Sequence, residues 1–215
     1  MELNELIDSD LLNKYEFVNY GHALEILTTA FTSEWVDILA CLKNFKITKT
    51  DLLASGGNES PIPKKIDELL YPKGWKEIRI KGNLTVDQYI RQASQRKRFD
   101  ERCESVVIEN YIDGHNIDFV KNKVALDLEW NSKDQTFDRD LMAMRTYHEC
   151  GIIDVGIILT RAENLNDIFS ELGIKSKYGA STTWMGKLTY RLDARRNGGC
   201  PILAIGITKR VIENE

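Results

Sequence analysis

The chain has 215 residues, a formal net charge of −4 at pH 7, and hydrophobic residues at 42% of positions. This length is sufficient for one α/β domain with a proper core. No apolar run approaches the length of a membrane span, and residues 1–5 do not resemble a signal peptide. The composition therefore excludes an integral membrane protein, and we expect a cytoplasmic protein.

The cysteine pattern also bears on the expected compartment. Four cysteines are far apart and form no CxxC pair: Cys41, Cys103, Cys150 and Cys200. Free buried thiols in a reducing cytoplasm fit this spacing better than a disulfide or a zinc site.

Helical spacing dominates the first part of the chain. Apolar residues recur through residues 22–45 at the spacing of one long amphipathic helix. The Ser/Gly-rich stretch 55–61 then interrupts the chain, and Ile62-Pro63 opens a second helix that runs through Leu70. Residues 76–80 are a candidate strand, and residues 88–104 are interpreted as a charged helix or a loop.

A β-hairpin is predicted over residues 117–130, after a strand at 106–111. The two-residue turn Asn122-Lys123 connects its strands. Antiparallel pairing sets Lys121 opposite Val124 and, in the same register, Asp118 opposite Asp127.

Three carboxylates of this hairpin converge in the predicted register. Strand periodicity places Asp127 and Glu129 on one face and apolar residues on the other. Like charges opposite each other destabilise a strand pair, so a cation between Asp118, Asp127 and Glu129 is expected, and oxygen ligands suit Mg²⁺ or Mn²⁺. Acidic residues on the wet face of an edge hairpin are a common alternative, but the apolar character of this strand favours a central position.

The remaining elements alternate between helices and strands. Asp134 is expected to cap a helix that runs to about Cys150, and Gly151 ends it before a strand at 153–160. Residues 181–183 lead into a helix through Leu192, with Ser181 or Thr182 as the expected N-cap, and residues 201–207 form a last apolar strand. The order strand–strand–helix–strand predicts a mixed sheet flanked by helices.

Four segments together resemble a known nuclease family: residues 117–121, 124–130, 153–157 and 201–207. The block 111–207 resembles the restriction endonucleases of the BglII and BstYI type, within the PD-(D/E)xK superfamily. The resemblance implies an α/β restriction-endonuclease-like core in a single domain over residues 1–215. It would comprise a helical N-terminal part at about 1–104 and a catalytic core at about 105–210.

The same resemblance assigns the metal carboxylates. The first falls on Asp118 and the second on Asp127, where close relatives usually carry Glu. The third position, commonly Lys in the superfamily and Gln in these relatives, is Glu129, as in BamHI-type enzymes. These residues would hold one or two divalent ions, with the backbone carbonyl of Leu128 as an added candidate ligand.

Candidate DNA contacts follow the catalytic strand and surround the last helix. They are Asn131, Ser132, Lys133, Lys177, Ser181, Thr182, Thr183, Lys187, Arg195 and Arg196. The cluster Arg96-Lys97-Arg98, with Arg91, is a candidate phosphate contact. A solvated helix face is the alternative interpretation of such basic clusters.

A palindromic double-stranded DNA site requires a two-fold protein, so the resemblance implies a homodimer and a cognate DNA methyltransferase. Sites built on GATC are a guess from the named relatives. The sequence leaves two alternatives open: a repair nuclease of the same superfamily, and a degenerate DNA-binding module.

Overall fold

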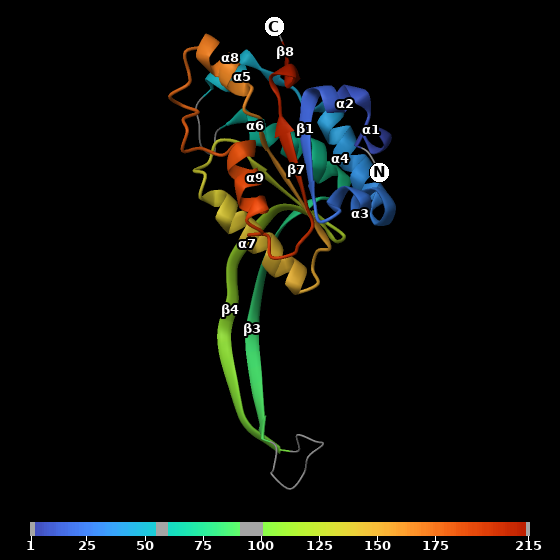
Figure 1. Cartoon of the computed structure of the whole chain (residues 1–215), viewed down its shortest axis with the longest axis vertical. Helices are drawn as coiled ribbons and strands as arrows, with labels where there is room; N and C mark the ends of the chain where they lie inside the picture. The colour runs from blue at the N-terminus through green and yellow to red at the C-terminus, as the bar shows by residue number, and fades with distance from the viewer. Residues whose placement is uncertain (1–2, 55–59, 91–100, 214–215) are drawn as a thin grey trace. The chain divides into compact units, whose positions relative to one another are not determined.

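The computed structural model describes residues 3–54, 60–90 and 101–213 (Figure 1). The chain forms two compact units, Met1–Ile78 with Ile117–Glu215, and Arg79–Asn116. The predicted loop at residues 55–59 and the basic cluster Arg91 with Arg96-Lys97-Arg98 lie outside the described residues. The proposed single domain over residues 1–215 stays a prediction.

Helices and strands alternate along the described chain. The helices are α1 (Leu3–Leu6), α2 (Ser9–Lys14), α3 (Ala23–Ala30), α4 (Thr32–Asn44), α5 (Lys49–Leu53), α6 (Pro61–Leu70), α7 (Thr136–Glu149), α8 (Leu165–Glu171) and α9 (Met185–Asp193), with 3-10 turns η2 (Tyr71–Lys73) and η3 (Lys209–Val211). The strands are β1 (Tyr15–Tyr20), β2 (Ile47–Thr48), β3 (Lys76–Ile90), β4 (Glu101–Lys121), β5 (Val124–Glu129), β6 (Val155–Arg161), β7 (Ile202–Ile207) and β8 (Ile212–Glu213).

The main sheet is mixed and has the strand order β1-β7-β6-β5-β4-β3. Strands β5, β6 and β7 run parallel, whereas β4 and β1 are antiparallel to their neighbours β5 and β7. All six residues of β5 are buried, as expected for a strand covered on both faces. The predicted α/β class, a mixed sheet flanked by helices, is confirmed.

The two faces of the sheet carry different helices. One face contributes Leu126, Ile157 and Leu203 to a large apolar cluster that also contains buried residues of α3, α4 and α6. The other face is covered by α7 and α9, which lie together in Figure 1. Gly156 permits the close approach of α7, because a Cβ there would lie 2.5 Å from the Met144 sulfur.

The predicted hairpin is confirmed in its turn and its register. Lys121 pairs with Val124, and Asn122 takes the left-handed conformation at φ 50° that a tight two-residue turn requires. Helix α4 holds this turn, since Asn122 donates to Glu34 Oε1 at 2.5 Å and Lys121 donates to Asp37 Oδ2 at 2.7 Å.

The N-terminal part differs from the prediction in two places. The helix predicted over residues 22–45 is two helices, α3 and α4, because Phe31 between them leaves the helical region at φ −126°, ψ 46°. Residues 15–20 form β1, which pairs with β7, so this part of the chain also supplies an edge strand to the sheet.

Three local predictions were also wrong. Residues 88–90 and 101–104 belong to β3 and β4, not to a charged helix or loop. Gln135 occupies the N-cap of α7 in place of Asp134, because the chain turns through Lys133–Thr136 before the helix. Neither Ser181 nor Thr182 caps α9, whose N-cap is Trp184 in an extended conformation.

The smaller unit consists of parts of β3 and β4. Arg79 Nη2 contacts Asp113 Oδ1 at 2.8 Å, and Asn110 donates its backbone N–H to Asn83 Oδ1 at 2.9 Å. Because the pairing runs in opposite directions along the two strands, they are antiparallel. Apolar residues remain exposed on this unit: Val86, Tyr89, Ile90, Val106, Val107, Ile108 and Tyr111.

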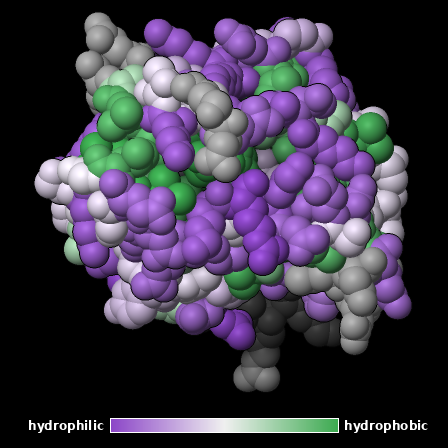
Figure 2. All heavy atoms as spheres, turned by 90° about the horizontal axis from the view of Figure 1, so that it is seen from above, coloured by the Kyte–Doolittle hydropathy of each residue, from purple (hydrophilic) through white to green (hydrophobic). Residues whose placement is uncertain are grey.

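Hydrophilic side chains cover most of one face of the molecule (Figure 2). The face in Figure 2 is mostly hydrophilic, with small apolar patches. Among the described helices, none combines the length and apolarity needed to cross a membrane. Cys41 and Cys200 are free and buried, as predicted, whereas Cys150 is free but exposed, because it follows the last turn of α7. The side chain of Cys103 lies outside the described residues.

Candidate active site

Asp118 and Asp127 lie opposite each other on β4 and β5. The backbone N–H of Asp118 donates to Asp127 Oδ1 at 2.8 Å, and the N–H of Leu128 donates to Asp118 Oδ2 at 3.3 Å. Each carboxylate is thus bonded to the backbone of the other strand. The predicted facing arrangement of these two residues is present.

The surroundings of both carboxyls disfavour their negatively charged forms. Asp127 is only 4% exposed, and burial together with the charge of Asp118 raises its pKa well above the usual value. Asp118 faces solvent on one side. The protein atoms around its carboxyl raise its pKa to about 6, and the charges of Glu129 and Glu77 add to this, although the Leu128 N–H opposes it. Asp127 Oδ2 is buried without a hydrogen-bond partner among the described residues.

Glu129 is directed toward helix α7. Its Oε2 accepts from Thr136 Oγ1 at 3.1 Å, and its Oε1 lies 3.4 Å from Arg139 Nη2. Its backbone carbonyl accepts from Thr160 Oγ1 at 2.6 Å, which fixes the end of β5 to β6. Helix α7 therefore sets the orientation of the third predicted carboxylate.

Asp140 is a fourth acidic group that the sequence analysis missed. Burial first, and then the charges of Glu129 and Asp127, raise its pKa to about 9. Its Oδ1 accepts from Arg139 at 2.9 Å, whereas its Oδ2 is buried without a partner in the described part of the chain. The available signal was an acidic residue on the apolar stripe of α7, three residues after the buried Phe137.

The donor set suits a hard divalent cation. Asp118, Asp127 and Glu129 offer only oxygen, which Mg²⁺ and Mn²⁺ prefer. In residues 3–54, 60–90 and 101–213, no three His, Cys, Asp or Glu side chains lie close enough together to form a metal-binding group. The unpartnered Asp127 Oδ2 is nevertheless a buried acceptor that a cation would satisfy, so the residues present fit such an ion.

A cavity of about 250 Å³ opens beside Asp118. Pro63, Asp67, Tyr71, Glu77, Asp118, Phe119 and Leu128 line it. Burial and the charges of Glu68 and Glu77 raise the pKa of Asp67. Asp67 is thus the acidic residue that α6 contributes to the lining of this cavity, while the neighbouring Glu68 is exposed.

The family of the chain follows from a comparison that covers almost all of it. Residues 15–207 match the model of the restriction endonuclease BglII/BglIII family. The chain belongs to this family. No individual curated protein gives a significant match.

Membership defines the enzyme class. The protein is a type II restriction endonuclease, a site-specific hydrolase of double-stranded DNA. The matched range begins with β1 and ends with β7, and therefore contains Asp118, Asp127 and Glu129.

Two predicted DNA-contacting segments of the endonuclease are joined. Residues 131–134 follow β5, and residues 177–183 precede α9; they meet in an antiparallel bridge between Lys133 and Thr182. The Thr183 N–H donates to the Ser132 carbonyl at 2.9 Å, and Asn131 Nδ2 donates to the Lys177 carbonyl at 3.2 Å. The segment after β5 and the loop before α9 thus form one structure.

The side chains of these segments differ in accessibility. Lys133 and Ser181 are exposed, whereas Thr182 and Thr183 are buried. The remaining three are half-buried: Asn131, Ser132 and Lys177.

Two lysines of this region already bind protein groups. Lys177 Nζ donates to the carbonyls of Leu52 and Ala54. Lys187 Nζ lies 3.3 Å from Asp134 Oδ2. A DNA contact by either residue stays a prediction, and it would compete with these bonds.

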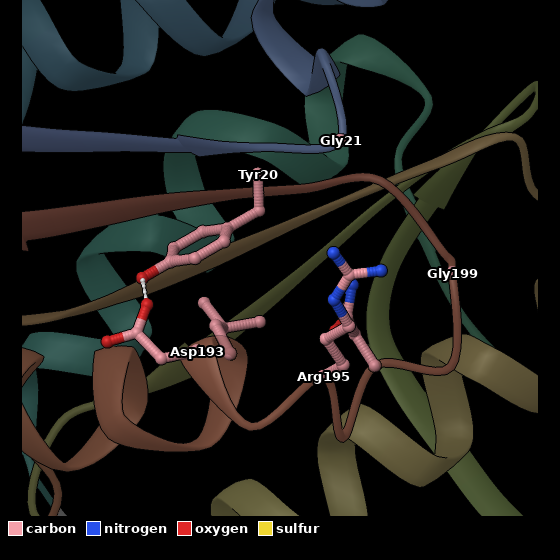
Figure 3. A pocket seen from close by; sticks show the side chains of 7 residues that line it. Tyr20, Gly21, Asp193, Arg195 and Gly199 are labelled. Carbon is pink, nitrogen blue, oxygen red and sulfur yellow. Dashed lines mark hydrogen bonds between the residues drawn. The ribbon is translucent and has the colours of Figure 1, made fainter.

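The backbone of Arg195 and Arg196 precedes β7, at the opposite end of the parallel strands from Glu129. They follow α9 near the start of β7, while Glu129 ends β5, which runs parallel to β6 and β7. Arg195 lines a cavity of about 390 Å³ with Tyr20 and Asp193, whose side chains are hydrogen-bonded at 2.8 Å (Figure 3). Arg196 is paired with Asp138. Asp138 also pairs with Arg191, which lies 4.0 Å from Asp134 in the segment after β5. Arg196 is therefore connected to that segment, whereas Arg195 lines the cavity.

Proposed function

We propose that this restriction endonuclease hydrolyses one phosphodiester bond in each strand of a short palindromic site, at a divalent-metal centre formed by Asp118, Asp127 and Glu129. One observation carries the proposal. Asp127, on a central strand and buried on both faces, faces Asp118 and retains an oxygen without a partner among the described residues. Such a group destabilises a fold unless a cation or another ligand compensates it.

The metal would be held by carboxylate oxygens of Asp118, Asp127 and Glu129 and by the backbone carbonyl of Leu128. Mg²⁺ is the proposed ion, with Mn²⁺ as a substitute. When bound, it would polarise the scissile phosphate and lower the pKa of a coordinated water.

The chain itself orients these groups. The Leu128 N–H fixes one oxygen of Asp118, and the Asp118 N–H fixes one oxygen of Asp127, which leaves the other oxygens for the ion and the attacking water. Thr136 and Arg139 donate hydrogen bonds to the Glu129 carboxylate and so fix its orientation. In this arrangement Glu129 orients the water.

DNA recognition is assigned to the joined segments 131–133 and 177–183 together with Lys187. The antiparallel bridge between them supports this role, because a base contact made by either segment acts on the end of the catalytic strand. Arg195 and Arg196 are proposed as further DNA contacts, with Arg196 connected to the segment after β5 through Asp138 and Arg191. A homodimer, a cognate methyltransferase and a cytoplasmic location complete the proposal.

A plasmid digest tests the function. Wild-type protein with Mg²⁺ should give discrete bands, and excess EDTA should prevent cleavage. Asp118→Ala should bind the same DNA without cutting it. A smear would instead indicate a nuclease without sequence specificity, and binding without cleavage by the wild-type protein would indicate a degenerate module.

A further inference from the structure

Arg161 is a buried cation that the proposed chemistry does not use. It ends β6 and is only 1% exposed. Burial lowers its pKa to about 10, so the guanidinium stays charged at neutral pH. Burying a charged group costs free energy unless specific contacts offset it, so the contacts of Arg161 indicate its role.

Those contacts are concentrated on the loop before α9. Arg161 Nη2 donates to the Tyr178 carbonyl at 3.4 Å and to the Thr182 hydroxyl. The guanidinium carbon lies 5.6 Å from the centre of the Tyr178 ring and 5.5 Å from that of Phe169, and these two rings stack at 4.0 Å. Both hydrogen-bond acceptors are neutral, and Nε has no partner among the described residues. The charge is therefore held by the loop and the ring pair.

The other end of this connection is the catalytic strand. Thr160, the neighbour of Arg161, pairs with Glu129 and donates Oγ1 to its carbonyl. Two consecutive residues of β6 thus hold Glu129 on one side and Thr182 on the other. The loop containing Thr182 is in turn bridged to Lys133, four residues after Glu129.

These contacts close a ring from the catalytic strand through β6 and the loop back to residues 131–134. We propose that Arg161 is a positioning residue that couples DNA recognition by segments 131–133 and 177–183 to the carboxylates at the end of β5, without itself contacting DNA. The inference rests on the proposed function, because it assumes that these segments read the DNA site.

The physical basis is the tolerance of the reaction to misplacement. The scissile phosphate is positioned by base contacts made through the loop, whereas the carboxylates are positioned by β5. A displacement of about 1 Å between them can lower the rate by about 100-fold. Arg161 limits this displacement because its Nη2 donates to two loop atoms while the planar guanidinium packs against the Tyr178 and Phe169 rings, and a lysine ammonium does not reproduce this packing.

Single-turnover cleavage with excess enzyme tests the coupling. Arg161→Lys and Arg161→Met are compared with the wild-type protein on the cognate site and on a site with one base pair changed. The cognate rate should fall by about 100-fold. The ratio of cognate to altered-site rates should fall by about 10-fold, because correct base contacts no longer place the phosphate. This ratio is independent of the fraction of folded enzyme.

Thr182→Val provides a second arm that preserves the buried arginine. It removes the hydroxyl acceptor and should also lower the ratio, and the combined Arg161→Met/Thr182→Val variant should show less than the product of the two effects. Leu42→Ala, a core change on α4, is the control for general destabilisation and should leave the ratio unchanged.

The outcomes separate the two proposals. A wild-type protein that cuts DNA without discrete products contradicts the proposed function. A site-specific wild-type protein whose ratio is unchanged in Arg161→Lys and Thr182→Val overturns the role of Arg161 alone. If the Arg161 variants do not fold, Phe169→Leu decides the question, because it removes one of the two rings beside the guanidinium and lies outside the segments that read the DNA. An unchanged ratio in Phe169→Leu would then overturn the role of Arg161.

Discussion

Acidic groups lie at both ends of the β4–β5 hairpin, in opposite electrostatic situations. One is Asp37 of α4, beside the turn, and the others are Asp118 and Asp127 of the hairpin itself. At the turn, Asp37 accepts hydrogen bonds from Lys121 at 2.7 Å and from Lys73 and Trp75 at 3.2 Å. Burial would raise the pKa of Asp37, but these bonds outweigh it and hold the pKa below its usual value. At the other end, the pKa values of Asp118 and Asp127 are raised.

This difference separates structural charges from functional ones. A carboxylate surrounded by donors stabilises the fold, and replacing it should cost stability without affecting chemistry. A carboxylate that faces another carboxylate destabilises the fold, and its presence indicates that a ligand compensates it. Substitutions at the two ends of the hairpin should therefore differ in what they change: the cleavage rate at one end and the stability at the other.

Loss of either facing aspartate should have the largest effect. Asp118→Ala and Asp127→Asn should each lower the Mg²⁺-dependent cleavage rate by a factor on the order of 100 to 1000, because charge stabilisation at the reacting phosphate is removed. Specific DNA binding should persist and can become tighter as carboxylate–phosphate repulsion falls. Cleavage rate and binding affinity are measured separately.

Asp154→Asn is a matched control, since Asp154 pairs with Lys123 near the turn and its loss should not change the rate. Normal turnover by Asp127→Asn would exclude the site assignment.

Glu129 offers a graded version of the same test. Glu129→Lys should be inactive, because it replaces an acceptor by a cation beside Arg139 and the ion, and each like-charge pair at roughly 4 Å costs about 4 kcal/mol at an effective dielectric of about 20. Glu129→Gln keeps the shape and one oxygen, and should retain partial activity. Cleavage rates of the two variants are compared side by side. An active lysine variant with an inactive glutamine variant would show that Glu129 acts as a base.

At the turn, Asp37→Asn should affect stability and not chemistry. The expected loss in the free energy of unfolding is about 2 kcal/mol, since hydrogen bonds to a charged acceptor are weakened. Urea unfolding measures this loss, and the cleavage rate at low temperature should equal that of the wild-type protein. An unchanged unfolding free energy together with slower cleavage would reverse the proposed contrast.

The pH dependence of stability should be the smallest effect. The pKa of Asp37 is lowered in the folded protein, so its contribution is present above its ordinary value of 3.8 and is lost as the pH falls toward the folded pKa. The difference in unfolding free energy between the wild-type protein and Asp37→Asn should therefore stay constant at neutral pH and shrink as the pH falls below about 5. Urea titrations at each pH measure it, and a difference that grows on acidification would contradict the assignment.

The acidic hairpin and the central strands of the fold could be predicted from the sequence alone. Alternating apolar residues and the Asn122-Lys123 turn fix the register of β4 and β5, because a slip by one residue would move every side chain to the other face. The continuous apolar stretches of β6 and β7 predicted buried strands, because a strand covered on both faces has apolar side chains on both. Asp118 and Asp127 were therefore found opposite each other without knowledge of the rest of the molecule.

The groups from distant parts of the chain that surround this hairpin could not be predicted, because they depend on how helices and loops pack against it. Asp140 and Arg139 reach Glu129 because α7 packs against Gly156, and Arg161 reaches Thr182 because β6 ends beneath the loop before α9. The break at Phe31 and the pairing of β1 with β7 were missed for a related reason. Local periodicity reports which face of a segment is apolar, but contacts between segments far apart in sequence depend on how those faces pack together.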